Sequence, residues 1–445
     1  MSAKERSVLF SGVAERVGME TRPKFTYFIW LTVGYSVSQF GTYLNMVALG
    51  LYVFHVTGRA LDTGMFMALR LLTSVVSGPA IGGLANRVNR RAAMVGADLV
   101  QATALVVLVL APAAAQGVLI YGLAVFLGLG GTVSNVLLRS SVPMLVGDDQ
   151  RVRANGYLVT GRSTAMTLGF ALAGVVVAFA GYEAAFLISA STFSVSALVL
   201  FLVPLSFRRP ARDGTSSGTE PETDGFWRTQ RLALAAVSAF PVLLFMLVIR
   251  GLDAFGSASH NIGIPIFASL EYPDDPAWFV SGFWTAWAIG SLSSYRLFGK
   301  RIDAMGASGG ERGFVIGTCL MSSFFILAFT GLPLYLLVPV AACAGLADGY
   351  TEIAYNTRLQ AVPEAQRGAA FGFSSLLEMG GLGVGMIVSS VLLEVWSPLP
   401  VVGSLHGLVI VVALAFIGFS LVAGWRRGRA KAAEGKAGFG VGPQE

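Results

Sequence analysis

Long apolar runs without charged residues alternate along the chain with short polar connections. No Asp, Glu, Lys or Arg occurs from Leu99 to Leu138, from Gly313 to Ala347, or from Val395 to Trp425. A helix that crosses the hydrocarbon core of a bilayer needs about 20 mainly apolar residues, whereas soluble cores need no runs of this length. The pattern therefore predicts an all-α membrane protein that crosses the bilayer many times.

Turn signals divide these runs into twelve predicted membrane-spanning helices. Gly58, the segment Ala111–Gly117 and the segment Gly331–Pro333 each separate two neighbouring spans. The predicted spans cover residues 26–53, 61–84, 92–112, 117–139, 155–180, 184–206, 232–267, 277–298, 312–331, 334–357, 367–393 and 399–424.

Basic residues lie mostly in alternate connections. The two tails and every second connection carry nearly all Lys and Arg, while the other connections hold Arg59 and several acids. By the positive-inside rule, both termini are predicted to be cytoplasmic. The net charge of +6 then reflects anchoring at the membrane rather than binding of nucleic acid. Only five of the 31 basic residues are Lys, and such a bias toward Arg is typical of a GC-rich bacterial genome. We therefore expect the chain in the inner, or plasma, membrane of a bacterial cell.

A polar, Gly/Ser/Thr/Pro-rich segment in the middle of the chain divides it into two halves. The ends of the fourth and tenth spans, Asn135–Pro143 and Asn356–Pro363, resemble each other. Two parallel six-helix halves are the arrangement that supports alternating access. We predict a cytoplasmic tail at 1–24, a six-helix half at 25–206, a cytoplasmic linker at 207–231, a second six-helix half at 232–424 and a basic cytoplasmic tail at 425–445.

The segment Gly83-Leu-Ala-Asn-Arg-Val-Asn-Arg-Arg91 resembles a motif of the major facilitator superfamily, Gly-x-x-x-Asp-Arg-x-Gly-Arg-Arg/Lys. Leu138–Asn155 and Arg358–Gly368 resemble the corresponding connections of its bacterial drug and siderophore exporters, including macrolide-efflux-like and enterobactin-exporter-like proteins. The resemblance covers about residues 26–424 and implies the major facilitator fold. It also implies a cytoplasmic gating motif made of Gly83, Asn86, Arg87, Arg90, Arg91 and Asp98.

Three residues of that motif carry expectations of their own. Asn86 stands where the family has Asp, so the charged latch between the halves is expected to be weakened or to lie elsewhere. Gly83 is expected to allow close approach to a neighbouring helix. Asp98 is a candidate partner for Arg139 or Arg162.

Ionisable groups inside a membrane span are costly, so each is a functional candidate. Asp348 and Glu352 are four residues apart on one helical face, and neighbouring like charges favour proton uptake. Each acid also has an alternative role without proton transfer. Asp253 could simply pair with Arg250, and Asp348 and Glu352 with Arg301, Arg312 or Arg358. Glu378 could be a neutral side chain held by hydrogen bonds. The predicted proton-coupling residues are Asp253, Asp348, Glu352 and Glu378.

Other polar side chains in the spans are candidates for the substrate cavity. The segment Gly256–Pro265 is expected to be a softened or broken helix that exposes backbone groups. His260 within it either titrates near neutral pH or is a capped or solvated residue near the outer end. The scarcity of charge in the first, fourth and fifth spans argues against a highly charged substrate. The predicted cavity residues are Gln39, Tyr43, Asn45, Arg70, Arg250, His260 and Asn261.

The sequence contains no phosphate-binding Gly-x-x-x-x-Gly-Lys-Ser/Thr loop and no His/Cys spacing typical of a metal site. We therefore expect no cofactor, no metal and no enzymatic activity. The predicted function is proton-coupled efflux by an antiporter that exports a small amphipathic or hydrophobic compound, such as an antibiotic, siderophore or other natural product, and could confer multidrug resistance. The expected partners are that substrate, protons and the lipid bilayer, with the chain as a monomer. The alternatives are an importer or facilitator of a small polar metabolite, and a membrane sensor or scaffold without transport.

Overall fold

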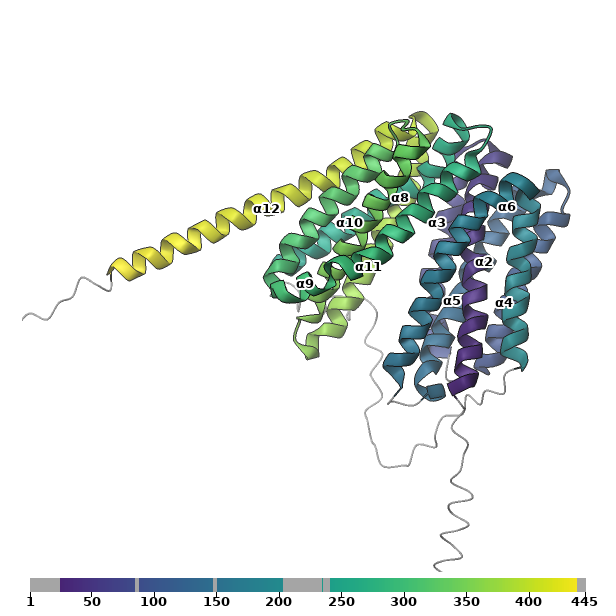
Figure 1. The fold of residues 1–445 in the computed structure, drawn as a ribbon, viewed down its shortest axis with the longest axis horizontal. Helices are drawn as coiled ribbons and strands as arrows, with labels where there is room; N and C mark the ends of the chain where they lie inside the picture. The colour runs from purple at the N-terminus through teal and green to yellow at the C-terminus, as the bar shows by residue number, and fades with distance from the viewer. Residues whose placement is uncertain (1–24, 85–87, 147–149, 203–233, 235–240, 438–445) are drawn as a thin grey trace, which may run out of the picture. The chain divides into compact units, whose positions relative to one another are not determined.

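The computed structural model describes residues 25–84, 88–146, 150–202, 234 and 241–437. These residues form ten helices and no strand (Figure 1). The helices are α2 (Phe25–Thr57), α3 (Ala60–Leu84), α4 (Arg90–Leu110), α5 (Ala113–Val146), α6 (Arg151–Leu202), α8 (Pro241–Glu271), α9 (Pro276–Ala328), α10 (Leu334–Gln360), α11 (Glu364–Val395) and α12 (Pro398–Ala437).

The helix boundaries follow the turn signals of the sequence. Gly58 separates α2 from α3 with a φ of 66°, and Gly331 precedes α10 with a φ of 75°. Glycine adopts such positive φ values at no steric cost. Asn89 caps the start of α4, where its side chain accepts a hydrogen bond from the backbone N–H of Ala92 at 3.2 Å.

The helix α6 contains two predicted spans joined at Gly181, whose φ of 79° interrupts the helical backbone. Its 52 residues would extend about 78 Å as a straight helix, far more than the bilayer core of about 30 Å. Gly161 in the first arm lies against Ser36 of α2, and Val199 in the second arm lies against Gly34 of α2. The two arms therefore run side by side in opposite directions.

The helix α9 also contains two predicted spans. Gly345 of α10 lies against the backbone of Trp287, and Thr351 of α10 lies against Gly317. In a straight helix, Trp287 and Gly317 would be about 45 Å apart and could not both contact this short part of α10. The arms of α9 are therefore antiparallel, and the ten described helices carry all twelve predicted spans.

The predicted break in the segment Gly256–Pro265 is wrong, because α8 is helical from Pro241 to Glu271. Proline removes one backbone donor from a helix, and neighbouring groups can compensate for this loss. Gly256 packs closely against Val409 of α12, and Gly385 of α11 packs closely against the backbone of Phe255. This packing holds the segment in helical form.

Contacts divide the chain into two compact units, Met1–Ala48 with Leu69–Gly218, and Leu49–Ala68 with Thr219–Glu445. Inside the first unit, α2 packs on both arms of α6. Inside the second unit, α8 packs on α11 at Gly251 and Gly385 and on α12 at Gly256. The first, fifth and sixth predicted spans thus pack in the same way as the seventh, eleventh and twelfth.

The described structure can be compared with only some of the predicted domain boundaries. Residues 49–68, which lie in the predicted first half, belong to the second unit, where Gly64 lies against Ser390. The helix α12 continues to Ala437, beyond the predicted end of the last span at 424. The predicted tail at 1–24 and the linker at 207–231 lie outside the described residues, and the division into two six-helix halves stays a prediction.

The surface of the helices is apolar, as expected for contact with lipid. All ten described helices are long and apolar enough to cross a membrane. Large apolar side chains such as Leu110 and Phe179 are about four-fifths exposed, at 78% and 81%. Such exposure would be costly in water and is favourable in hydrocarbon. The chain is therefore a multi-pass membrane protein.

Candidate functional site

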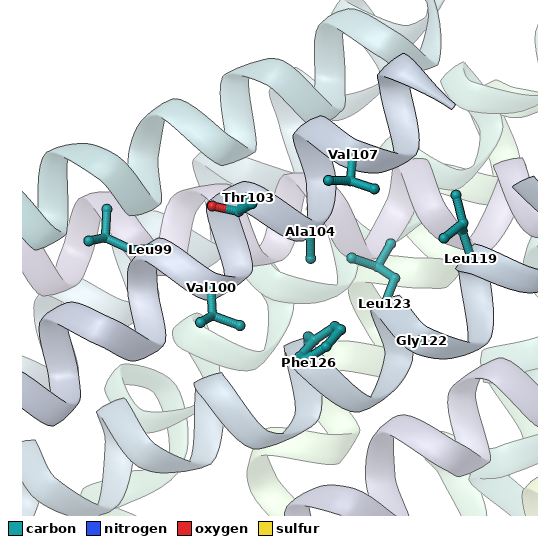
Figure 2. Close-up of a pocket in the computed structure, with 9 residues that line it drawn as sticks. All are labelled: Leu99, Val100, Thr103, Ala104, Val107, Leu119, Gly122, Leu123 and Phe126. Carbon is teal, nitrogen blue, oxygen red and sulfur yellow. The ribbon is translucent and has the colours of Figure 1, made fainter. Parts of the chain in front are cut away.

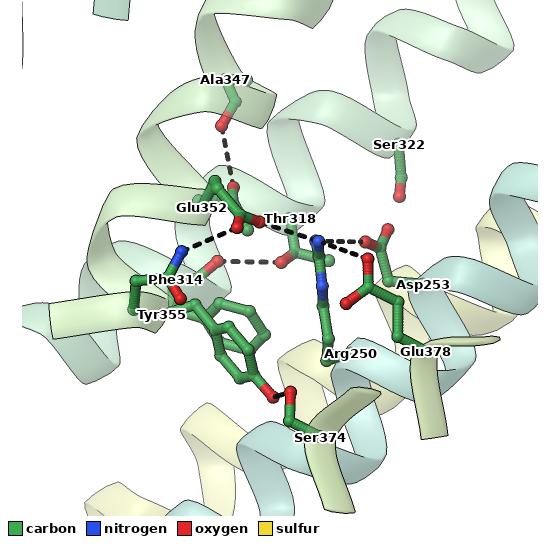
Figure 3. Close-up of polar contacts among 12 residues, drawn as sticks. Arg250, Asp253, Phe314, Thr318, Ser322, Ala347, Glu352, Tyr355, Ser374 and Glu378 are labelled. Carbon is green, nitrogen blue, oxygen red and sulfur yellow. Dashed lines mark hydrogen bonds and ion pairs between the residues drawn. The ribbon is translucent and has the colours of Figure 1, made fainter. Parts of the chain in front are cut away.

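A single guanidinium in the second unit binds three carboxylates from three helices. Arg250 of α8 contacts Asp253 on the same helix, with 3.4 Å between Nη1 and Oδ2. Its Nη2 lies 2.8 Å from Oε2 of Glu352 on α10 and 3.1 Å from Oε1 of Glu378 on α11. Figure 3 shows these carboxylates directed toward the guanidinium. We call Arg250, Asp253, Glu352 and Glu378 the ion cluster.

The ion cluster carries more negative than positive charge. Asp348 of α10 adds a fourth carboxylate within electrostatic range of Arg250. One guanidinium cannot neutralise three or four ionised carboxylates, and like charges in a low-dielectric site favour protonation of some of them. The arrangement therefore has the capacity to hold exchangeable protons.

Burial differs among the members of the cluster. The side chains of Arg250 and Asp253 are only 12% and 4% exposed, whereas that of Glu352 is 48% exposed. Oδ1 of Asp253 and Nε of Arg250 are buried without a hydrogen-bond partner in the described structure. Asp253 is thus the most enclosed carboxylate of the cluster, and Glu352 the most accessible.

The structure brings together all four predicted proton-coupling residues around Arg250. The alternative in which Arg312 or Arg358 neutralises Asp348 and Glu352 is not seen among the described residues, because Glu352 binds Arg250 at 2.8 Å and Arg358 binds Glu311 at 3.0 Å. The side chain of Arg301 lies outside the described residues. Self-neutralisation of Arg250 and Asp253 describes only part of the site. Sequence reasoning missed the link between α8, α10 and α11, since the partners of Arg250 lie 102 and 128 residues away.

The predicted cavity residue His260 lies in the core of the second unit. His260 is 4% exposed, and its Nδ1 lies 3.0 Å from Nε2 of His406 on α12. Nδ1 of His406 in turn lies 3.1 Å from the hydroxyl of Ser322, and the ring of His260 stacks on Phe325. The expectation of a solvated histidine is therefore wrong. Asn261 donates to the carbonyl of Ser257 within its own helix.

The other predicted cavity residues belong to the first unit. Gln39 and Asn45 are buried, at 9% and 1% exposure, and Oδ1 of Asn45 has no described partner. Gln39 and Asp98 both line a small cavity. Arg70 is half-buried and lies within electrostatic range of Tyr43.

Tyr43 lines a cavity of about 190 Å³ in the first unit, where polar and apolar side chains meet. Arg162 of α6 donates from Nε to the hydroxyl of Tyr43 at 2.8 Å. Tyr35 lines the same cavity and donates to Oδ1 of Asn135 at 3.2 Å. We call this space the arginine pocket. Its lining residues are Tyr35, Tyr43, Leu138, Arg139, Asn155, Leu158, Val159, Arg162, Ser163 and Met166.

Sequence reasoning missed the arginine pocket, although a signal was present. Arg162 lies inside the predicted span 155–180, where a basic side chain is unusual. Arg139 at the end of the fourth predicted span and Arg162 in the fifth both line the pocket, so charge is less scarce beside this cavity than the sequence pattern indicated.

The gating motif is described only in part, since Asn86 and Arg87 lie outside the described residues. Arg90 is buried and donates to the carbonyl of Ser140 and the hydroxyl of Ser141. Arg91 lies over the ring of Phe201. An added Cβ at Gly83 would meet no described atom within 4 Å, so the expected close approach does not occur within the described part of the first unit.

The predicted ion pair of Asp98 is also wrong. In the described part of the chain, its carboxylate accepts a hydrogen bond from Ser134 at 3.1 Å and also faces Ser196. Both hydroxyls come from neighbouring helices of the first unit. Asp98 is therefore held by neutral donors.

An apolar groove of about 400 Å³ lies between α4 and α5 (Figure 2). Its lining is almost entirely aliphatic or aromatic, and Thr103 supplies its one hydroxyl. Leu99, Val107 and Phe126 are each nearly half exposed. A groove of this kind on a membrane-spanning surface is suited to lipid chains and offers no charged group for coupling.

Comparisons with known proteins agree with this architecture. The model of the Major Facilitator Superfamily matches residues 31–361. No curated protein sequence matches the chain significantly.

Several solved transporters share the fold of the chain. The nucleoside transporter NupG is similar with a TM-score of 0.64 and 18% identity over 88% of this chain and 98% of that chain. A bacterial homologue of the iron transporter ferroportin gives a TM-score of 0.69 and 15% identity over 89% and 99%. A bacterial homologue of the human lysosomal transporter Spinster gives 0.64 and 15% over 91% and 96%.

The family match covers most of the chain, and the structural matches cover nearly the whole of each transporter. The chain has the major facilitator fold and is a transporter rather than an enzyme. It belongs to the Major Facilitator Superfamily.

Proposed function

We propose that the chain is a proton-coupled exporter of small amphipathic organic compounds. The observation that carries this proposal is the excess of carboxylates around Arg250, three in direct contact and a fourth in electrostatic range. Protonation of one carboxylate releases it from competition for the guanidinium. The contacts that join α8, α10 and α11 then change, which couples proton binding to helix movement.

Asp253 and Glu378 are the carboxylates that we assign to proton exchange. Asp253 is buried with one oxygen unpaired, so protonation supplies a neutral form suited to that environment. Glu378 comes from a different helix, and its loss of charge weakens a contact between α8 and α11. Asp348 and Glu352 contribute the surrounding negative charge.

Transport in everted membrane vesicles tests the coupling and its direction. An acidic vesicle interior should drive accumulation of antibiotics, siderophores or other amphipathic compounds in exchange for protons. The panel should include a nucleoside, because a nucleoside transporter shares the fold. Accumulation that requires an acidic exterior would instead identify an importer, and absence of flux for every compound would favour a sensor or scaffold.

Two substitutions identify the coupling residues. Asp253→Asn and Glu378→Gln should each abolish the response to the pH gradient while substrate still exchanges across the membrane. Glu311→Gln provides a matched control, since Glu311 binds Arg358 outside the ion cluster. If both cluster variants respond to pH as the unchanged protein does, the assignment of the coupling site is wrong.

A further inference from the structure

The arginine pocket is positively charged, and all of its lining residues belong to the first unit, whereas the ion cluster belongs to the second. Arg139 of α5 and Arg162 of α6 both line it, and both side chains are exposed to the open space. Tyr35 lies within electrostatic range of both guanidinium groups. Arg70 adds a third positive charge within range of Tyr43.

No carboxylate in the described part of the chain pairs with Arg139 or Arg162. Asp98, the buried acid of this unit, is bound by Ser134. Tyr43 accepts a hydrogen bond from Nε of Arg162, and this bond leaves the two terminal nitrogens of that guanidinium available as donors. Arg162 lies inside the predicted span 155–180, where an uncompensated guanidinium is costly, and an anionic ligand would offset that cost.

The remaining lining is suited to an apolar group. Leu158, Val159 and Met166 form one side of the pocket along α6. A volume of about 190 Å³ accommodates an acidic group with one or two fused rings or a short chain, and is below the usual 300–1,000 Å³ of a complete drug-sized site. The pocket thus combines fixed donors for a small anion with a short apolar surface.

We propose that the arginine pocket binds the carboxylate of an amphipathic organic acid, with Arg162 and Arg139 as its donors. Tyr43 positions the guanidinium of Arg162, and the apolar lining receives the carbon skeleton next to the carboxylate. The inference rests on the proposed function in assigning this ligand as the exported substrate. Binding itself requires no proton gradient and is tested separately.

Equilibrium dialysis of the purified full-length protein in detergent, with radiolabelled 1-naphthoate, measures this binding directly. The neutral analogue 1-naphthamide has nearly the same shape, so we expect it to bind about tenfold or more weakly, as the loss of a charge-assisted hydrogen bond implies. Inorganic phosphate should compete poorly, because it lacks the apolar part. Equal affinity for naphthoate and naphthamide would overturn the proposal, and so would equal affinity for naphthoate and phosphate.

Substitutions locate the site. Arg162→Gln should weaken naphthoate binding about tenfold or more and weaken naphthamide binding much less, because the neutral amide gains less from the guanidinium charge. Arg153→Gln is the matched control, because Arg153 lies on the same helix but packs over the ring of Phe25 outside the pocket. If Arg162→Gln does not yield folded protein, Arg139→Gln serves as the second variant, with the same expected direction. Unchanged naphthoate affinity in a folded pocket variant would overturn the proposal.

The two proposals fail in distinguishable ways. Charge-selective naphthoate binding without proton-driven flux would support the pocket and contradict the proposed exporter. Proton-driven flux that depends on Asp253, without charge-selective binding, would support the exporter and overturn the carboxylate pocket.

Discussion

Arg250 and Arg162 both lie within membrane-spanning helices, yet their surroundings are opposite. Arg250 is nearly buried and contacts three carboxylates from three helices. Arg162 is exposed to a pocket and contacts the neutral hydroxyl of Tyr43. One guanidinium has too many acidic partners and the other has none among the described residues. The role of an intramembrane arginine is therefore decided by its neighbours rather than by its position in the span.

The difference also separates two kinds of chemistry. An excess of carboxylates around one cation favours exchange of protons, because protonation relieves repulsion between them. Cations without acidic partners favour an anionic ligand, because the ligand supplies the missing charge. In our proposals, the second unit exchanges protons and the first unit binds the acidic group of the substrate.

The largest expected effect comes from removing the cation of the ion cluster. Arg250→Gln leaves buried Asp253 without its counter-charge, and breaking a buried ion pair typically costs about 3–5 kcal/mol of unfolding free energy. We expect a large loss of thermal stability in detergent together with loss of transport. Arg250→Lys should recover part of the stability, since it keeps the charge but not the planar fork of donors.

The matched change in the first unit is Arg162→Gln. Because Arg162 is exposed and has no described ionic partner, this variant should unfold within a few degrees of the unchanged protein. Equal destabilisation by Arg250→Gln and Arg162→Gln would show that the two arginines do not differ as their surroundings indicate.

The next effect concerns helix packing around the ion cluster. Gly381 of α11 lies directly against the backbone of Gly251, one residue from Arg250, and has no room for a Cβ. Gly381→Ala should therefore separate α8 from α11 and lower the unfolding free energy by about 1–3 kcal/mol. Gly380→Ala is the control, since a Cβ at Gly380 meets no described atom within 4 Å.

This substitution also tests how closely the two units correspond. Gly169 of α6 lies against the backbone of Phe40 on α2, the matching interface of the first unit. Gly169→Ala should destabilise the protein by a similar amount, because the first and fifth predicted spans meet there as the seventh and eleventh meet at Gly381. If Gly381→Ala were as stable as Gly380→Ala, close packing would not hold the cluster in place.

Local signals in the sequence located most of the fold. The charge-free runs predicted the spans, and Gly58 and Gly331 marked breaks that the structure confirms, because positive φ values favour glycine wherever they occur. The segment Gly256–Pro265 misled because its composition is that of a turn, while packing on α11 and α12 keeps it helical.

The sequence predicted which residues of the sites are unusual, but it did not predict which side chains they contact. A charge inside an apolar run identifies Asp253 or Glu378 as unusual, since the membrane makes any charge costly there. Asp253 is a local partner of Arg250, but Glu352 and Glu378, and His406 beside His260, are more than 100 residues away, and nothing local encodes those contacts. Arg162 carried the same signal, and its significance depends on which side chains α2 and α5 bring beside it.

The smallest expected effect comes from an ion pair at the exposed end of the helices. Arg59, between α2 and α3, binds Glu394 of α11 at 3.3 Å, and the two side chains are 56% and 35% exposed. Exposed pairs contribute about 0–1 kcal/mol, because water already solvates both charges. Arg59→Ala should therefore shift thermal unfolding only slightly, and high salt should remove the difference.

Glu394→Ala should cost more than Arg59→Ala, because Glu394 also accepts a hydrogen bond from the backbone N–H of Leu61 at 3.0 Å. That bond links the start of α3 to α11 and does not depend on Arg59. Thermal unfolding of both single variants and the double variant separates the two contributions. A loss for Arg59→Ala as large as that for Arg250→Gln would show that burial does not set the cost of these ion pairs, and the contrast between the two intramembrane arginines would lose its physical basis.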